Sequence, residues 1–374
     1  MPKGGDNVSS LLFMTAEFHT RLRKIRRRLS DSDSDALVVT HVPNIYYLCG
    51  FIGSAGVLVV EANRATLFTD GRYRTQAREQ VRGSGVKVEI PQGPILHAVG
   101  VHLGRRRMLA GFEPGALTVA AKAQLTRAAG RKVSWRAASG WVEGLRAIKS
   151  AAEIVQMRAA ARLICRVFEE VIELIRPGLT ELDIAAEMDF RMRKQGAEGP
   201  SFETIVASGP RAALPHARPT AKRLSRNELV VLDAGAILTG YCSDMTRTVC
   251  VGKATRQVKS WYSAVLEAQK AGCEAVSDGV EAGAPDAAAR RVLDGYVLGR
   301  YFVHSTGHGL GLEVHETPRL AKGQTQRLEA GMVVTIEPGV YFPGVGGIRI
   351  EDDLAIFEDK TERLTTAPRE LLEL

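Results

Sequence analysis

Two apolar stretches in the second half of the chain each run into an acidic residue, turn, and return with a second acidic residue. The first stretch is ELVVLDAGAILTGYCSDMTRTVCVG, residues 228–252, which carries Asp233 and Asp244. In a two-residue hairpin, opposite residues have a constant sum of positions. A turn at residues 238 and 239 therefore predicts that Asp233 and Asp244 are cross-strand neighbours, about 5 Å apart at Cβ.

The second stretch is GMVVTIEPGVYFPGVGGIRIEDDLAIF, residues 331–357. Its apolar strand leads into Glu337, and the return strand carries Glu351. A hairpin centred near Gly344 predicts that these two acids face each other. The neighbouring Asp352 and Asp353 are expected to be in part solvent-exposed acids in salt bridges.

Four acids at the ends of apolar strands are costly to bury, because like charges repel and lose their hydration. The sequence leaves three solutions open: protonation, pairing with Arg247 and Arg349, or cation binding. Cation binding accounts for all four acids together. Oxygen-rich ligation with one imidazole suits manganese, cobalt or zinc, and four carboxylates would neutralise two divalent ions.

A glycine-rich segment, HSTGHGLGLEVHE at residues 304–316, holds three of the eight histidines of the chain. Alone it suggests a three-histidine zinc site. Beside the acid hairpins it is better interpreted as one imidazole ligand with two further histidines nearby. Glycines at these positions allow the backbone to approach a metal or substrate closely.

The length of 374 residues and the order of the motifs indicate two domains. Residues 1–143 alternate strand and helix patterns, including a hairpin around residues 61–64 and a break at Pro43-Asn44, which predicts an α/β domain. Residues 144–374 begin with a strong helical pattern from Ala151 that Pro177-Gly178 ends. A repeated order of helix, strand or loop, and His-x-x-Pro, ending at residues 215–219 and 314–318, suggests an internal duplication.

Composition narrows the function classes. No stretch has the roughly 18 unbroken apolar residues of a membrane span, and five scattered cysteines fit a reducing cytoplasm. The net charge of +8 owes much to RLRKIRRRLS, residues 21–30, where apolar residues recur at helical spacing. We interpret this segment as an amphipathic helix with a solvated basic face, and we expect neither nucleic acid nor membrane as a partner.

The motifs VVLDAGAILTGYCSDMTRT, HSTGHGLGLEVHE, TIEPGVY and GIRIED resemble, in order and spacing, those of the pita-bread metallopeptidases. Two earlier segments, DALVVTHVPNIYYLCGF and FTDGRYRTQA, are similar to the smaller domain that precedes the catalytic domain in aminopeptidase P and prolidase. The resemblance implies an α/β N-terminal domain followed by an α+β pita-bread (creatinase/aminopeptidase-like) catalytic domain with pseudo-twofold symmetry. It also implies a peptide substrate and a homodimer.

The resemblance assigns a role to ten residues. Metal ligands would be Asp233, Asp244, His308, Glu337 and Glu351; catalytic residues would be His216, His315 and Glu337; substrate-binding residues would be His304, Tyr341 and Arg349. These imply two divalent ions per subunit, with manganese expected and cobalt or zinc as alternatives. The implied reaction is hydrolysis by a metal-bridging hydroxide.

The expected function is an Xaa-Pro aminopeptidase, which releases the N-terminal residue from peptides with proline second. A first alternative is an Xaa-Pro dipeptidase (prolidase), which must recognise the C-terminal carboxylate of its substrate with a placed arginine. A second alternative is a metal-free pita-bread binding protein.

Overall fold

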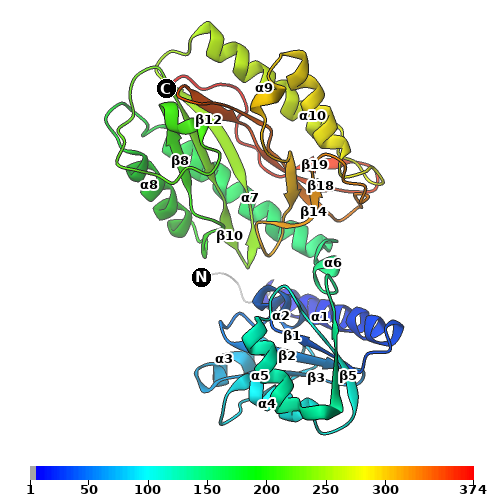
Figure 1. Ribbon diagram of the computed structural model, residues 1–374. Helices are drawn as coiled ribbons and strands as arrows, with labels where there is room; N and C mark the ends of the chain where they lie inside the picture. Colours follow the sequence, from blue (N-terminus) through cyan, green and yellow to red (C-terminus); the bar gives the residue numbers. More distant parts are fainter. Residues whose placement is uncertain (1–5) are drawn as a thin grey trace. The chain divides into compact units, whose positions relative to one another are not determined.

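The computed structural model describes residues 6–374, with side chains from residue 16 onward. The chain divides into two compact units, residues 1–145 and 146–374, which Figure 1 shows in blue to teal and in green to red. In the described residues, no helix combines the length and the apolar character that are needed to cross a membrane.

The first unit is a six-stranded mixed sheet with helices, in the strand order β4-β3-β2-β1-β5-β6. The strands are β1 (Ala36–Val39), β2 (Gly56–Glu61), β3 (Ala65–Thr69), β4 (Val86–Glu89), β5 (Met108–Phe112) and β6 (Val133–Ala137). The helices are α1 (Asp6–Asp31), α2 (Val42–Cys49), α3 (Arg74–Gln80), α4 (Ile95–Leu103), α5 (Val119–Ala129) and α6 (Glu143–Arg146), the last at the boundary between the units. This is the α/β architecture that the alternating pattern predicts.

Two local predictions for this unit have different outcomes. The hairpin around residues 61–64 is confirmed, since β2 and β3 pair antiparallel with Val60 opposite Ala65. The apolar run is interrupted as predicted, since β1 ends at Val39, but Pro43-Asn44 is not a turn, because Pro43 lies in the first turn of helix α2. A proline is well placed there, since its missing N–H has no intrahelical acceptor at that position.

The second unit combines four long helices with short antiparallel sheets. The helices are α7 (Ala151–Ile172), α8 (Glu181–Lys194), α9 (Arg256–Glu274) and α10 (Ala284–Gly295). The strands are β7 (Gly199–Pro200), β8 (Ile205–Ser208), β9 (Glu228–Ala234), β10 (Ala236–Leu238), β11 (Tyr241–Cys242), β12 (Met245–Val251), β13 (Gly307–Gly309), β14 (Glu316–Leu320), β15 (Val333–Ile336), β16 (Gly339–Phe342), β17 (Gly346–Arg349), β18 (Asp352–Ile356) and β19 (Thr361–Arg363).

These elements form two similar halves. In the first half, α7 and α8 pack against the sheet β12-β9-β8 and bury apolar residues such as Phe168, Met188 and Val230. In the second half, α9 and α10 lie side by side and pack near the sheet β14-β13-β15-β18-β19 and the ribbon β16-β17 (Figure 1). Each half thus contributes a helix pair and a sheet, and the strands of both halves meet at the centre of the unit.

Candidate active site

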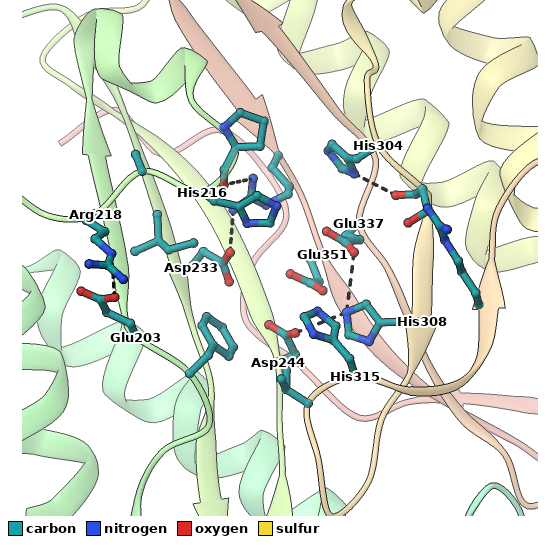
Figure 2. Close-up of a pocket in the computed structure, with 18 of the residues that line it drawn as sticks. Glu203, His216, Arg218, Asp233, Asp244, His304, His308, His315, Glu337 and Glu351 are labelled. Carbon is teal, nitrogen blue, oxygen red and sulfur yellow. Dashed lines mark hydrogen bonds and ion pairs between the residues drawn. The ribbon is translucent and has the colours of Figure 1, made fainter. Parts of the chain in front are cut away.

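A pocket of about 650 Å³ lies where the strands of the two halves meet. Figure 2 shows acidic and histidine side chains pointing into it from both sides. Nine of the ten residues predicted from the sequence line the pocket: His216, Asp233, Asp244, His304, His308, His315, Glu337, Arg349 and Glu351. The tenth, Tyr341, is hydrogen-bonded to two of them.

The first acid hairpin has a different register from the predicted one. Its turn lies at Thr239-Gly240, one residue later than predicted. Asp233 is therefore opposite Thr246, and Asp244 lies two residues before Thr246 on the return strand. Both turn residues have positive φ, 52° and 77°, which a two-residue hairpin turn requires and which glycine adopts easily. Because side chains alternate with a period of two, the shift of two keeps both acids on one face.

The second acid hairpin has the predicted register. Ile336 pairs with Asp352 and Gly339 pairs with Arg349, and the position sum of both pairs places Glu337 opposite Glu351. The hairpin is centred on residue 344, as the glycine-rich turn indicates. Two hairpins, one from each half, therefore deliver the four acids to one place (Figure 2).

His308 extends from strand β13 with its ring orientation fixed by the backbone. Its Nδ1 lies 3.0 Å from the carbonyl oxygen of Gly309, so Nδ1 carries the proton and donates. Burial, followed by the proximity of His315, lowers the pKa of His308 to about 4, so the ring is neutral at neutral pH. The lone pair of Nε2 then faces Asp244 Oδ2 at 3.8 Å and Glu337 Oε1 at 3.7 Å.

The neutral ring thus turns one lone pair toward a carboxyl oxygen of each of two acids. The distances are too long for hydrogen bonds but suit ligands of one cation, since two atoms each about 2.1 Å from an ion lie at most about 4.2 Å apart. Ligand atoms of Asp244, His308 and Glu351 all lie within 4.8 Å of one another. The second nitrogen of His308 is oriented by a carbonyl, as is usual for a histidine that binds a metal.

The acids of the cluster also have oxygens without partners. In the described part of the chain, a buried oxygen of each of four acids makes no hydrogen bond: Asp233 Oδ1, Asp244 Oδ1, Glu351 Oε1 and Asp353 Oδ1. The second oxygen of Asp233 accepts from Arg349 Nη2 at 2.5 Å, and that of Glu351 accepts from Thr246 Oγ1 at 2.6 Å. Buried polar atoms in native proteins are nearly always satisfied, so the three exceptions that line the pocket, at Asp233, Asp244 and Glu351, indicate missing ligands.

The electrostatics agree with the geometry. Burial raises the pKa of Glu337 to about 8. It raises the pKa of Asp244 and Glu351 well above their ordinary values, and neighbouring carboxylates add to the effect. Arginine pairing, one of the three solutions left open by the sequence, applies mainly to Asp233, which Arg349 contacts directly. The rest of the cluster needs protons or cations, and its unpartnered oxygens fit divalent metal ions.

The expected exposure of Asp352 and Asp353 is wrong, because both are buried, although Asp352 forms a salt bridge with Arg247. Asp352 accepts from Arg247 Nη2 at 2.7 Å, from Thr365 and from Gln269. Asp353 accepts from the backbone N–H of Asp244 at 3.1 Å. Their donors lie far away in the sequence, so neighbouring residues give no sign that these acids are buried behind the cluster.

A chain of hydrogen bonds links His304 to the acids. Arg349 Nη1 donates to the hydroxyl of Tyr341 at 2.7 Å, and that hydroxyl lies 2.8 Å from His304 Nε2. His304 Nδ1 is 2.8 Å from the Ser305 carbonyl, so Nδ1 is the donor and Nε2 accepts from Tyr341. Burial lowers the pKa of His304 to about 4. His304 is thus a neutral ring with both nitrogens engaged.

The other two histidines are more open to the pocket. His216 and His315 are both exposed on its wall (Figure 2). The His315 ring packs edge-on against His308, with centroids 4.4 Å apart. Burial, followed by His216, lowers the pKa of His315. These two imidazoles are placed to touch a molecule bound in the pocket.

Sequence reasoning missed several pocket residues, among them Phe202, Arg218 and Arg319. Arg218 forms an ion pair with Glu203 at 3.0 Å. Arg319 is exposed and lies opposite His308 in the β13–β14 pairing, and its side chain forms no hydrogen bond or ion pair with any described residue. Its place opposite His308 depends on the pairing of β13 with β14, which no local pattern indicates.

Comparison with known protein families matches both units. Residues 155–358 match the metallopeptidase family M24, and residues 21–148 match the creatinase/prolidase N-terminal domain. The chain is 36% identical to the Xaa-Pro dipeptidase of Pyrococcus furiosus, covering 94% of this chain and 99% of that protein.

Solved structures give the same result. The Xaa-Pro dipeptidase from Bacillus anthracis is 38% identical with a TM-score of 0.91, covering 96% of this chain and all of that one. The X-Pro aminopeptidase from Thermotoga maritima is 34% identical with a TM-score of 0.85, covering 91% and 98%.

Proposed function

Because this chain belongs to metallopeptidase family M24, with a creatinase/prolidase N-terminal domain and a pita-bread catalytic domain, we propose that it is a metal-dependent Xaa-Pro dipeptidase. The observation that carries the metal-dependent part is the lone pair of His308 Nε2 that faces two buried carboxylates. The homodimer and the cytoplasmic location expected from the sequence stay predictions.

The family implies divalent metal ions, and the residues of the pocket fit them. Two ions would be held by five side chains: Asp233, Asp244, His308, Glu337 and Glu351. Manganese, cobalt and zinc all suit this donor set. Bound there, the ions would lower the pKa of a water molecule and polarise the scissile carbonyl.

The side chains around the cluster would complete the reaction. His216 and His315, on the pocket wall, can donate an imidazole N–H to the developing oxyanion. Glu337 can accept a proton from the attacking water and return it to the departing proline nitrogen. The nitrogen of any amide must gain a proton to leave as an amine, and in an Xaa-Pro bond this proton becomes the N–H of the released proline.

Arg319 supports the dipeptidase over the aminopeptidase that the sequence first suggests. A dipeptide places its C-terminal carboxylate within a few ångströms of the scissile bond, so a dipeptidase needs a cation close to the cluster. Arg349 is bound to Asp233 and Tyr341, and Arg218 is bound to Glu203. Arg319 has a guanidinium with no partner in the described chain and lies beside His308. Because the similar structure from Thermotoga maritima is an X-Pro aminopeptidase, aminopeptidase activity is the alternative.

The test compares Gly-Pro with Gly-Pro amide and with Arg-Pro-Pro, on manganese-loaded wild type and Arg319→Gln. We expect wild type to prefer Gly-Pro, and Arg319→Gln to lose about 10- to 100-fold in kcat/KM on Gly-Pro only, the value of a charged hydrogen bond of about 1.5–3 kcal/mol. Arg218→Gln is the matched control and should keep the preference. Efficient cleavage of Arg-Pro-Pro at the Arg-Pro bond would support the aminopeptidase instead.

A further inference from the structure

Two buried acids occupy similar places in the two halves of the catalytic unit. Glu181 is the first residue of α8, Asp286 is the third residue of α10, and the accessible fraction of each is 0%. Each acid accepts hydrogen bonds from both the backbone N–H and the hydroxyl of one residue, Ser208 in the first half and Thr306 in the second. The internal duplication suggested by the sequence thus reappears as a repeated set of contacts.

In the first half, the contacts of Glu181 hold both ends of the segment that carries His216. Ser208 donates at 2.8 Å from its N–H and 2.9 Å from its hydroxyl. Thr220 donates at 3.0 Å from its N–H and 2.8 Å from its hydroxyl. Burial raises the pKa of Glu181, but the hydrogen bonds from Thr220 and Ser208 outweigh it and keep the carboxyl ionised.

Arg211 connects Glu181 to a second point in the segment that carries His216. Arg211 Nε donates to Glu181 Oε2 at 3.0 Å, and its Nη2 donates to the carbonyl of Arg218 at 2.5 Å. That carbonyl lies two residues after His216. The backbone on both sides of the histidine is therefore tied to one carboxylate.

The second half repeats the scheme around His304. Thr306 donates to Asp286 Oδ1 at 3.2 Å from its N–H and at 2.8 Å from its hydroxyl. Arg290 Nε donates to Asp286 Oδ2 at 2.8 Å, and its Nη2 donates to the carbonyl of His304 itself at 2.6 Å. As with Arg211, an arginine bound to the acid holds the backbone of a histidine that lines the pocket.

We propose that Glu181 and Asp286 are positioning residues, which act on the reaction only by holding His216 and His304 in place; this rests on the proposed function. Neither acid lines the pocket. An acid needed only for its own helix would bind the amides of that helix, as Asp183 does with Thr180. Glu181 and Asp286 instead accept from the segments that carry the histidines, where a displacement of about 1 Å can cost about 100-fold in rate.

Double-mutant cycles test this with Gly-Pro as the substrate. Glu181→Gln keeps the shape but turns an amide toward the donors of Thr220 and Arg211. We expect it to lower kcat/KM by about 10-fold in wild type, and by less than about 2-fold when His216 is already alanine, because coupled residues are not additive. Asp286→Asn should behave likewise with His304→Ala. The crossed pairs, such as Glu181→Gln with His304→Ala, should be additive.

Asp183→Asn, in the same turn of α8, is the matched control and should leave kcat/KM unchanged. Bound manganese, measured on each purified variant, should equal that of wild type. If Glu181→Gln fails to fold, Ser208→Ala and Thr306→Ala remove one donor each and replace the acid variants in the cycles.

Two results would overturn the proposal. If Glu181→Gln lowers kcat/KM equally in wild type and in His216→Ala, Glu181 supports the site in general, and only the positioning role is overturned. No hydrolysis of any Xaa-Pro substrate by the manganese-loaded wild type would overturn the proposed function together with it.

Discussion

Glu61 of the N-terminal unit and Asp244 of the catalytic unit are both buried acids, 3% and 5% accessible. Glu61 accepts from Arg64 Nε at 2.5 Å and Arg106 Nη2 at 3.3 Å, and its Oε2 lies 3.2 Å from His102 Nε2. Burial raises its pKa, but the hydrogen bonds from His102 and Arg64 outweigh it and lower the pKa to about 2. Asp244 has an unpartnered oxygen, and burial raises its pKa well above the ordinary value.

The difference in partners and pKa distinguishes an acid that stabilises the fold, Glu61, from an acid placed to bind a ligand, Asp244. Two arginines of the protein itself, Arg64 and Arg106, form ion pairs with Glu61, so its charge is compensated within the fold. Around Asp244 the nearest groups are other acids and a neutral imidazole. A buried charge without compensation is kept only where something else supplies the cation. Burial alone therefore does not distinguish the two acids, whereas their hydrogen-bond partners do.

The largest expected effect is that of Asp244→Asn on turnover. We expect kcat to fall by about 1,000-fold, because an interaction with a metal is worth several kcal/mol in the transition state. The melting temperature of the metal-free protein should stay equal or rise, because the substitution removes one of several repelling charges. Calorimetry and steady-state kinetics on Gly-Pro measure the two effects. Turnover like that of wild type would break the distinction between the two acids.

The opposite result is expected for Glu61→Gln. It should leave kcat unchanged but lower the free energy of unfolding of the N-terminal unit by about 2 kcal/mol, because the charged donors lose the negative charge and one of the two acceptor oxygens. Urea unfolding followed at pH 7 measures the effect. A loss of turnover with unchanged stability would mean that the two acids do not differ as described.

A smaller effect is the pH dependence of the difference in stability between wild type and Glu61→Gln. The folded pKa of Glu61, about 2, is below its ordinary value, so the ionised carboxylate stabilises the fold at pH above about 4.5. That contribution is lost as the pH falls from about 4.5 toward about 2. The stability gap between wild type and Glu61→Gln should therefore shrink between pH 5 and pH 3. A gap that stays constant over this range would contradict the low pKa.

The two acid hairpins show how far sequence could predict the site. The glycine-rich turn of the second hairpin gave the right register, with Glu337 opposite Glu351. In the first hairpin the predicted turn was displaced by one residue from Thr239-Gly240, and the acids still share a face because side chains alternate. Local patterns thus placed the acids without fixing their partners.

Features that depend on distant partners were not predictable from local patterns. Asp352 looked exposed because its donor Arg247 is 105 residues away in the sequence. Glu181 is in the first turn of α8, where acids are common, and only the structure shows that it binds Ser208 and Thr220. The order of elements was local information and was largely predictable; the hydrogen-bond network around the site was not.

Two divalent cations held by Asp233, Asp244, His308, Glu337 and Glu351 are the central proposal. Its most direct test is the stoichiometry of bound manganese, measured by calorimetric titration of metal-free wild type with the Asp244→Asn and Glu61→Gln variants beside it. We predict two ions per chain for wild type and Glu61→Gln, with weaker or fewer ions for Asp244→Asn. Folded wild-type protein that binds no manganese, cobalt or zinc would contradict the claim.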